Sequence, residues 1–309
     1  MTNADFERIV DTSDEWITTR TGIKERRISD ENTHSSDMAT AALKSALEMA
    51  ETSPEEIEAL ILGTVTPDYR LPSTACITQE KVGFKNAVAF DIVAACTGFI
   101  TAMSVARGFI QAGVYRKVAI VGVEKLSSIT NYHDRNTCVL FGDAAGAAIL
   151  EADISGRGVL GTHLKSDGSM KEWLWMPVGG TVEPITPDYD WDNRDKLAMN
   201  GSEVFKVAVR QMCNSALKVI EDAGLKRDDI SLVVPHQANI RIIEAIAKRL
   251  KVSMDKVVVN IDRYGNSSSA SVPLALDEAN RAGRLKPGDN VVMVAFGGGM
   301  IWGAALVKW

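Results

Sequence analysis

The sequence predicts an α/β protein in which one structural unit occurs twice. Short β-rich runs alternate with helical runs along the chain, which is typical of layered folds with largely parallel strands buried on both faces. Four apolar segments of the first half recur in the same order in the second half, as a duplication requires. The chain has 309 residues, of which 46% are hydrophobic, so it can bury a large core without disulfides.

The duplication is visible in matched pairs of segments. The pairs are 55–62 with 228–235, 88–92 with 258–262, 117–121 with 290–294, and 146–150 with 303–307. Short apolar strands also resemble one another by chance, but four matches in one order favour a duplicated unit. We therefore expect two halves, residues 1–157 and residues 158–309. Because no low-complexity linker separates these halves, we expect them to pack as one body.

In the first half, apolar periodicity sets the expected elements. Residues 36–49 predict a helix because Met38, Ala42, Ala46 and Met49 recur at three- and four-residue spacing. The other expected elements are strands at 60–63, 88–92 and 118–121 and helices at 74–81 and 98–111.

The second half repeats this alternation after an additional extended segment, residues 158–163. Its expected elements are helices at 204–222, 240–251 and 272–281 and strands at 232–234, 257–261 and 291–295. Residues 173–195 are rich in Pro, Asp and Trp and predict a long irregular insertion. Nothing in residues 1–35 matches the additional extended segment, so we expect the first half to lack one strand.

Charge and composition exclude several classes of protein. The net charge of −6 weighs against general nucleic-acid binding without excluding a local basic patch. The longest apolar runs, such as 291–296, are far shorter than the about 20 residues that span a membrane. Residues 1–10 contain no apolar core and do not resemble a signal peptide. The four cysteines are widely spaced and form no C-x-x-C pair, which indicates a reduced, cytoplasmic protein.

Cys96 is the first candidate for chemistry. A strand leads into the small residues Ala94 and Ala95, and a helix leaves at Gly98. This places the sulfur at a helix N-terminus, where the helix dipole and free N–H groups favour a thiolate. The alternative is a buried structural cysteine, which is the usual fate of this residue type. Three other cysteines lack such a setting and are expected to be packing residues: Cys76, Cys138 and Cys213.

His236 and Asn266 are the next candidates. His236 follows a buried strand and precedes a helix, and Asn266 occupies the repeat position that corresponds to Cys96. Units related by a twofold axis would bring those two positions together in the middle of the molecule. An isolated histidine, or an asparagine in a turn, is more often structural, but the shared repeat position favours a functional triad. The other histidines lack matching context, and no spacing suits a metal site.

Two glycine-containing segments follow strands. Gly297, Gly298 and Gly299 do not form a phosphate loop, because no helix opens with a G-x-G-x-x-G pattern and no Walker lysine is present. We expect instead a crowded backbone beside a reacting centre, whose N–H groups can donate to a carbonyl oxygen. Residues 141–146 are expected to form a tight structural turn.

Several motifs together resemble a known family. They are Ala94–Gly98, Pro235–Arg241, Gly265–Ser267, Phe296–Gly299, Asp11–Ile17 and Arg20–Ile23. In this order they resemble β-ketoacyl-[acyl-carrier-protein] synthase III, a thiolase-like enzyme that starts type II fatty-acid synthesis. The resemblance runs from Thr2 to Trp309. It implies a five-layered αβαβα fold, a homodimer in the cytoplasm and no cofactor, since the coenzyme A (CoA) thioester is a substrate.

The resemblance also implies a mechanism. Cys96 is expected to take an acyl group from acyl-CoA. His236 and Asn266 are expected to hydrogen-bond the malonyl thioester carbonyl and stabilise the enolate that decarboxylation produces. The resulting carbanion attacks the acyl-cysteine and gives β-ketoacyl-acyl carrier protein (ACP). The backbone N–H groups of Cys96 and Gly298 are expected to hold the oxyanion of the acyl-enzyme.

Binding residues are implied in the same way. The expected CoA contacts are Thr12, Trp16, Arg20, Thr21, Arg135, Phe205 and Asn239, with Trp16 and Arg135 on either side of the adenine. A locally basic stretch is expected to dock the acidic carrier protein rather than form an ordinary solvated face. The docking residues are Lys206, Gln237, Ala238, Asn239, Ile240, Arg241, Lys248 and Arg249. The acyl pocket is expected to include Leu71 and Phe296.

The sequence departs from the family pattern in places. Asn136 replaces a common Gly, Thr97 follows the cysteine where a smaller residue is common, and Leu71 replaces a common aromatic. The loop that carries Leu71 is expected to reach the partner's acyl pocket, so this change predicts longer or branched primers. The family also begins with a strand and a Gly-rich turn ahead of Thr2. Its absence predicts a start site placed too late or a shortened chain.

Three alternatives stay open. A cysteine hydrolase would share the order Cys, His, Asn, but the papain signature around its cysteine is missing. A related condensing or acyl-transferring enzyme of secondary metabolism would share the triad and use another acceptor. A non-catalytic thiolase-like subunit would not need the triad, whose presence argues against that reading.

Overall fold

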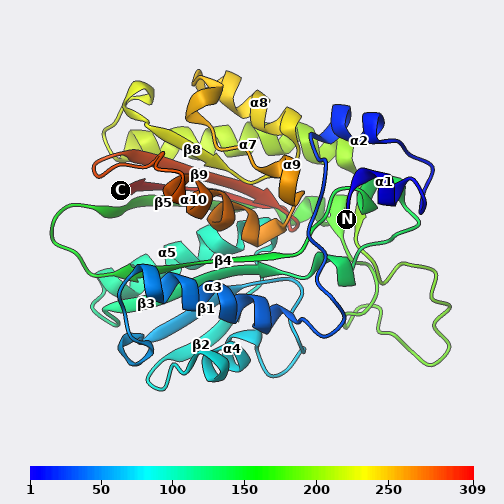
Figure 1. Ribbon diagram of the computed structural model, residues 1–309, viewed down its shortest axis with the longest axis horizontal. Helices are drawn as coiled ribbons and strands as arrows, with labels where there is room; N and C mark the ends of the chain where they lie inside the picture. The colour runs from blue at the N-terminus through cyan, green and yellow to red at the C-terminus, as the bar shows by residue number, and fades with distance from the viewer.

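The computed structural model describes residues 1–309 as a stack of five layers. Helices α3 and α4 cover the outer face of one sheet, α5 and α10 lie between the two sheets, and α7 and α8 cover the other outer face (Figure 1). The helices are α1 (Asn3–Phe6), α2 (Asp14–Thr21), α3 (Ser35–Met49), α4 (Thr74–Val82), α5 (Gly98–Gln111), α6 (Arg135–Cys138), α7 (Gly201–Asp222), α8 (Ile240–Leu250), α9 (Ile261–Tyr264) and α10 (Ser271–Arg281). The layers confirm the predicted α/β class.

Each half contributes one four-stranded sheet. The first has the order β2-β1-β3-β4 and the second the order β5-β10-β9-β8. The strands are β1 (Ala59–Gly63), β2 (Val88–Ile92), β3 (Lys117–Glu124), β4 (Ala144–Glu151), β5 (Gly158–Ser166), β8 (Leu232–Pro235), β9 (Asn290–Gly297) and β10 (Ile301–Lys308). The predicted strand at 88–92 and the predicted helix at 98–111 coincide with β2 and α5.

The prediction of largely parallel strands was wrong for the later strands of each half. β1 pairs in parallel with β2 and β3, and β8 with β9, but β4 and β10 run antiparallel to β3 and β9. The turn between β9 and β10 spans only residues 298–300, and so short a connection joins antiparallel strands only. β5 also runs antiparallel to β10, so both sheets are mixed.

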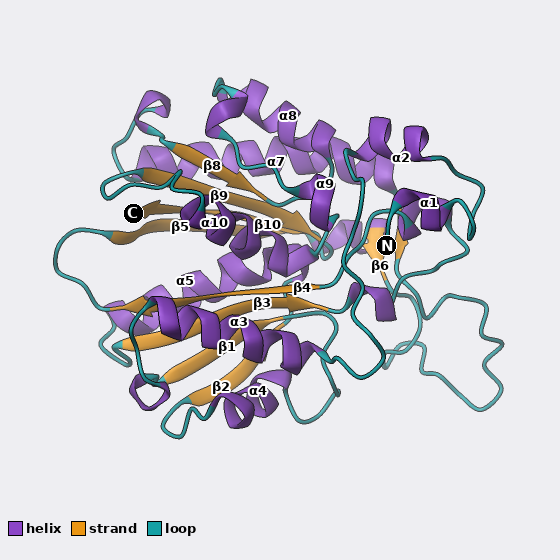
Figure 2. Cartoon of the chain, in the orientation of Figure 1, coloured by secondary structure: helices purple, strands orange, loops and turns teal.

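A second correction concerns residues 257–261, which were predicted to form a strand. Val257 makes only an isolated bridge to Val233, and Ile261 already begins α9. Residues 176–197 contain no helix or strand, and this irregular insertion extends from the body of the molecule (Figure 2). It is flanked by the short paired strands β6 (Leu174–Trp175) and β7 (Ala198–Met199).

The two sheets share a three-stranded centre and differ at both edges, because β2 lies beyond β1 in the first sheet whereas β8 is itself an edge strand of the second. β10 pairs with β9 on one side and with β5 on the other, whereas β4, its counterpart, pairs only with β3. The additional extended segment of the second half is therefore β5, and β4 has no strand on its other edge in this structure. The shared order β1-β3-β4 and β8-β9-β10 is what a duplicated unit predicts.

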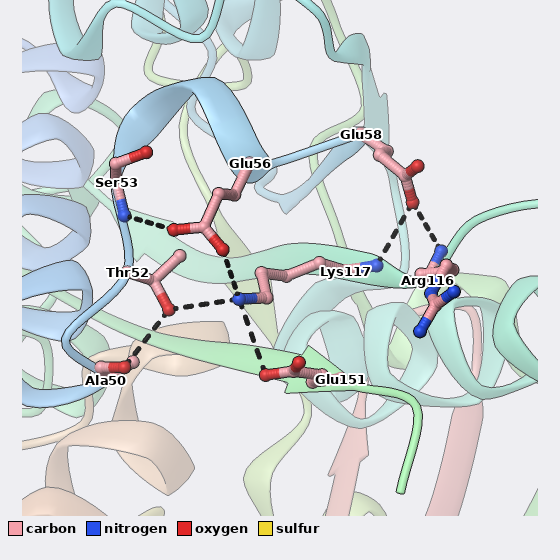
Figure 3. Close-up of polar contacts among 8 residues, drawn as sticks. All are labelled: Ala50, Thr52, Ser53, Glu56, Glu58, Arg116, Lys117 and Glu151. Atoms are coloured by element: carbon pink, nitrogen blue, oxygen red, sulfur yellow. Dashed lines mark hydrogen bonds and ion pairs between the residues drawn. The ribbon is translucent and has the colours of Figure 1, made fainter.

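A lysine network secures the sheet end that lies away from the candidate site. Lys117 begins β3, and its Nζ lies 2.8 Å from Glu56 and 3.4 Å from Glu151 at the end of β4 (Figure 3). Nearby, the carboxylate of Glu58 accepts the backbone N–H groups of Arg116 and Lys117. These contacts tie the starts of β1 and β3 to the end of β4.

None of the helices is both long and apolar enough to cross a membrane.

Candidate active site

The two halves interlock where α5 and α10 begin. A Cβ on Gly122, near the end of β3, would lie 2.3 Å from the carbonyl oxygen of Ser269. A Cβ on Gly98, which begins α5, would lie 3.0 Å from Ser269 Cβ, and a Cβ on Gly63, at the end of β1, would lie 2.7 Å from the Gly98 carbonyl carbon. Only glycine permits such backbone contact, so these positions bring the turn before α5 against the turn before α10.

Beside this junction lies a cavity of about 1390 Å³. Cys96, His236 and Asn266 all line it, so three side chains far apart in sequence share one space. Most of the other lining residues are apolar, including Leu174, Met199, Val204, Ala208 and Met212. The cavity is therefore suited to an extended, partly apolar ligand that carries a reacting group at its inner end.

Cys96 follows β2 in a short 3-10 turn, Ala95–Thr97, that leads directly into α5. Ala95 has φ of +43°, a left-handed conformation that is unusual for a residue with a Cβ and that often marks functional sites. The predicted position at a helix N-terminus is confirmed, but the side chain is only 8% exposed. Burial raises the pKa of the Cys96 thiol to about 12, and the charge of Glu124 adds to the rise.

The helix N-terminus is expected to favour a Cys96 thiolate, but burial acts in the opposite direction and raises the pKa of the thiol in this structure. Two of the remaining cysteines are buried as predicted, Cys138 and Cys213. Cys76 was expected to be a packing residue, but it is exposed on α4, which projects toward solvent there.

The glycine turn after β9 packs against Cys96. A Cβ on Gly297 would lie 2.6 Å from the backbone nitrogen of Cys96, so a larger residue would collide with the turn that holds the thiol. Gly298 and Gly299 line the cavity, and Gly299 has φ of +143°. This is the crowded backbone that the sequence predicts beside a reacting centre.

His236 follows β8 directly, and its backbone N–H donates to Val294 O over 2.7 Å. The side chain is 2% exposed, and its Nδ1 lies 2.6 Å from Ser271 Oγ. Burial lowers the pKa of His236 to about 3. The imidazole is therefore neutral at physiological pH and can donate a hydrogen bond from only one ring nitrogen.

Backbone hydrogen bonds to Leu140 and Gly142 fix the position of Asn266. Its N–H donates to Leu140 O over 2.8 Å, and its carbonyl accepts from Gly142 N over 3.0 Å. The segment 141–146 was predicted as a structural turn, but residues 144–146 already belong to β4, and only the part before β4, with Gly142, positions Asn266. The side-chain Oδ1 accepts the backbone N–H of Ser268 over 2.9 Å.

Sequence reasoning missed two polar residues at the cavity: Ser268, which lines it, and Glu124, which lies behind Ser268. Glu124 ends β3, is fully buried, and accepts hydrogen bonds from Thr66 Oγ1 over 2.8 Å and from Ser268 Oγ over 3.1 Å. Burial raises the pKa of the Glu124 carboxyl to about 7. Ser268 has φ of +48°. Hydrogen bonding by its side chain lowers the pKa of the Cys96 thiol and so opposes part of the rise caused by burial. The run of serines after Asn266 was the only sequence signal for this cluster.

Four of the residues expected to contact CoA lie in or near the cavity. Arg20 and Thr21 line it, whereas Trp16 packs under the guanidinium groups of Arg20 and Arg135, 4.9 Å and 5.4 Å from its ring centroid. Both arginines thus stack on Trp16 directly, and an adenine between Trp16 and Arg135 requires Arg135 to move. Thr12 Oγ1 is buried without a hydrogen-bond partner.

The residues expected to dock a carrier protein lie on two helices: Lys206 on α7, Gln237 to Arg241 at the start of α8, and Lys248 and Arg249 in its last turn. Asn239 and Ala238 line the cavity, and Asn239 also caps α8 by accepting the N–H of Arg241 over 2.9 Å. Ile240 is half-buried, and four cationic side chains are exposed: Lys206, Arg241, Lys248 and Arg249. Gln237 differs, because it is 1% exposed and bonds to Pro235 O and Val258 O inside the protein. Its side chain has no free polar atom for a partner.

The two residues expected in the acyl pocket have different surroundings. Phe296 lines the cavity and stacks on Trp302 with ring centroids 6.2 Å apart. Phe205, expected along the pantetheine tunnel, also lines the cavity. Leu71 is 87% exposed and lies outside the cavity of its own chain. No group of His, Cys, Asp and Glu side chains is placed to hold a metal ion.

A cysteine, a neutral histidine and an asparagine around one cavity in this five-layered fold are typical of thiolase-like condensing enzymes, a class of acyltransferases. The family described as 3-oxoacyl-[acyl-carrier-protein (ACP)] synthase III matches residues 90–168, and its C-terminal part matches residues 220–309. The chain belongs to this β-ketoacyl-[acyl-carrier-protein] synthase III family, whose enzymes act in fatty-acid synthesis.

Individual relatives agree with this assignment. The β-ketoacyl-[acyl-carrier-protein] synthase III of Caldanaerobacter subterraneus is 52% identical over 309 residues, which cover all of this chain and 93% of the relative. The Clostridioides difficile enzyme of the same name is also 52% identical, over 99% of this chain and 93% of its own. The crystal structure of 3-oxoacyl-[acyl-carrier-protein] synthase III from Aquifex aeolicus is 48% identical, with a TM-score of 0.93, over 100% of this chain and 95% of that one.

Proposed function

We propose that this chain condenses an acyl-CoA primer with malonyl-ACP through Cys96, His236 and Asn266. The observation that carries the proposal is that a cysteine at a helix N-terminus, a neutral histidine and an oriented amide line the same cavity. The products are β-ketoacyl-ACP, free CoA and carbon dioxide. No cofactor takes part, because the thioester bonds supply the reactive carbonyl carbons.

In the first half-reaction, the Cys96 sulfur attacks the thioester carbonyl of acyl-CoA. The carbon–sulfur bond to CoA breaks, the acyl group is left on Cys96, and the thiol proton leaves with CoA. The N–H groups of Cys96 and Gly298 donate to the oxygen that becomes negatively charged. The close packing of Gly297 on the Cys96 backbone supports this role, since it fixes the glycine turn beside the thiol.

In the second half-reaction, malonyl-ACP loses carbon dioxide and its thioester becomes an enolate. His236 and Asn266 donate hydrogen bonds to the enolate oxygen, a role that needs donors and not a strong base. The low pKa of His236 supports this reading, because a neutral imidazole can donate and is a poor proton acceptor. The carbanion then attacks the acyl-cysteine carbonyl, and Cys96 leaves as a thiolate that regains a proton.

Substrates reach this centre from the side that holds α2 and α8. CoA lies along Arg20, Thr21, Phe205 and Asn239, with its adenine near Trp16 and Arg135. The acidic carrier protein docks on the exposed cationic side chains of α7 and α8, which are Lys206, Arg241, Lys248 and Arg249. Replacing Arg249 with Glu should raise the KM for malonyl-ACP and leave the rate of acylation by acyl-CoA unchanged.

The enzyme works as a homodimer in the cytoplasm. β2 is an edge strand, and the exposed apolar side chains of Val88 at its start and Val93 directly after it would be covered by a second copy of the chain. The four free cysteines fit a reducing compartment. Leu71 of one subunit lines the acyl pocket of the other and admits longer or branched primers. Strict use of acetyl-CoA would contradict this part of the proposal.

The function is tested by supplying acyl-CoA and malonyl-ACP to the purified protein and identifying the product by mass spectrometry. We expect β-ketoacyl-ACP and one CoA released per turnover. Activity with another acceptor in place of malonyl-ACP would favour a condensing enzyme of secondary metabolism. Release of free acid from acyl-CoA, with no condensation, would favour a hydrolase.

A further inference from the structure

The His236 ring hydrogen-bonds to one side chain of the protein. Its Nδ1 lies 2.6 Å from Ser271 Oγ, and both residues are at most 2% exposed. Ser271 begins α10, the helix between the two sheets, so the contact joins the end of β8 to the α10 N-terminus. No water-exposed group or carboxylate is in hydrogen-bond contact with the ring.

The single proton of the Ser271 hydroxyl has two acceptors within reach. One is His236 Nδ1 and the other is Ser268 O, 2.9 Å away. If the hydroxyl donates to Ser268 O, then Nδ1 must carry the ring proton and the other ring nitrogen, Nε2, is left bare. If it donates to Nδ1, then a neutral ring carries its proton on Nε2.

Two observations favour donation to the ring. The contact with Nδ1 is the shorter of the two, 2.6 Å against 2.9 Å. In addition, Ser268 O already accepts the backbone N–H of Ser271, so it does not depend on the hydroxyl. The hydroxyl oxygen also lies 3.4 Å from the backbone N of Gln237, a contact that is compatible with either direction of donation.

We propose that Ser271 is a positioning residue that donates to His236 Nδ1 and thereby holds the ring proton on Nε2, the nitrogen without a protein partner. This inference rests on the proposed role of His236 as a donor to the malonyl thioester. A bare Nε2 would turn a lone pair toward the developing enolate oxygen and repel it. Ser271 should therefore serve decarboxylation and condensation, and it should not serve acylation of Cys96.

The direct test is the tautomer of His236 in the full-length protein. The imidazole nitrogen shifts of ¹⁵N-labelled protein distinguish a protonated Nε2 from a protonated Nδ1, and a His236→Gln sample identifies the signals. We expect the Nε2–H tautomer in the wild type and in Ser271→Thr, which keeps the hydroxyl. Ser271→Ala should lose this preference. A wild-type ring that is protonated at Nδ1 would overturn the inference, whatever the activity.

The kinetic test separates positioning from general damage. Ser271→Ala should reduce the condensation rate by roughly 10- to 100-fold, less than the roughly 10²- to 10³-fold loss that follows removal of an oxyanion donor. Acylation of Cys96 by acyl-CoA should stay within about twofold of wild type. Equal losses in both half-reactions would contradict a positioning role.

Ser267→Ala is the matched control, because the Ser267 hydroxyl is buried in the same turn and has no hydrogen-bond partner. This variant should leave the tautomer and both half-reactions unchanged. A loss in Ser267→Ala equal to that in Ser271→Ala would assign the effect to the turn as a whole and overturn the inference. If His236→Gln condenses normally, the proposed function fails instead, and the tautomer measurement still stands on its own.

Discussion

The backbone N–H of Ser268 donates to Asn266 Oδ1 over 2.9 Å, so the Asn266 amide has its oxygen bound within the protein. The NH₂ end of the same amide is left as the group that can meet a ligand in the cavity. The amide group of Asn266 is therefore oriented so that its NH₂ can donate a hydrogen bond to a ligand. Since it cannot titrate, it presents that donor at every pH at which the protein is folded.

This relationship predicts the behaviour of Asn266→Asp. The carboxylate would still accept the Ser268 N–H, but it would place a negative charge where the enolate oxygen develops. We expect a fall in condensation of roughly 10²- to 10³-fold, as for the loss of an oxyanion donor. Acylation of Cys96 should persist, as measured by intact mass after exposure to acyl-CoA. A variant that condenses at the wild-type rate would contradict the donor role.

The buried Glu124 predicts how stability depends on pH. Its folded pKa, about 7, lies above its ordinary value of 4.5, so the folded state binds this proton more tightly than the unfolded state. The stabilisation is complete below pH 4.5 and is lost as the pH rises through 7. Glu124→Gln stays neutral and should exceed wild type in free energy of unfolding by about 1–3 kcal/mol at pH 8.

At pH 5 the same variant should match wild type, because Glu124 is protonated in the folded protein there. Urea denaturation at the two pH values measures the difference. A Glu124→Gln protein that is less stable than wild type at pH 8 would show that the hydrogen bonds from Thr66 and Ser268 hold the carboxylate in its ionised form.

Gly297 predicts a steric effect at the nucleophile. In Gly297→Ala, the new Cβ would lie 2.6 Å from Cys96 N, so the turn must shift. We expect a loss of about 1–3 kcal/mol in stability and a slower acylation of Cys96. Gly108→Ala, in the exposed part of the same α5, meets nothing within 4 Å and should gain about 0.5–1 kcal/mol. Thermal unfolding and acylation rates compare the two variants.

The Lys117 network predicts that removing Lys117 lowers the free energy of unfolding more than removing Lys218. Lys117 is 14% exposed and joins Glu56 and Glu151 (Figure 3), whereas Lys218 is 49% exposed and pairs only with Asp222 on α7. We expect Lys117→Met to cost about 1 kcal/mol and Lys218→Met less than about 0.5 kcal/mol, since exposed pairs are weak. Equal losses in chemical denaturation would show that the network adds nothing beyond a surface pair.

The sequence could predict the positions of Cys96, His236 and Asn266 because each follows a recognisable apolar segment in a repeated pattern. It could not predict that the pKa of the Cys96 thiol is raised, since burial of the thiol depends on how the two halves pack around it. Glu124 was missed, because only the tertiary structure brings its carboxylate against Ser268. The directions of β4 and β10 were missed because an apolar strand has the same pattern in either orientation.

The most direct test of the account is the intact mass of the protein after incubation with acyl-CoA, followed by addition of malonyl-ACP. We predict one acyl group on the wild type, which disappears when malonyl-ACP is added, and no acyl group on Cys96→Ser. His236→Ala and Asn266→Ala should take up the acyl group and keep it. An acyl group on Cys96→Ser, or a wild-type adduct that malonyl-ACP does not discharge, would contradict the assignment of Cys96 as the nucleophile of a condensing enzyme.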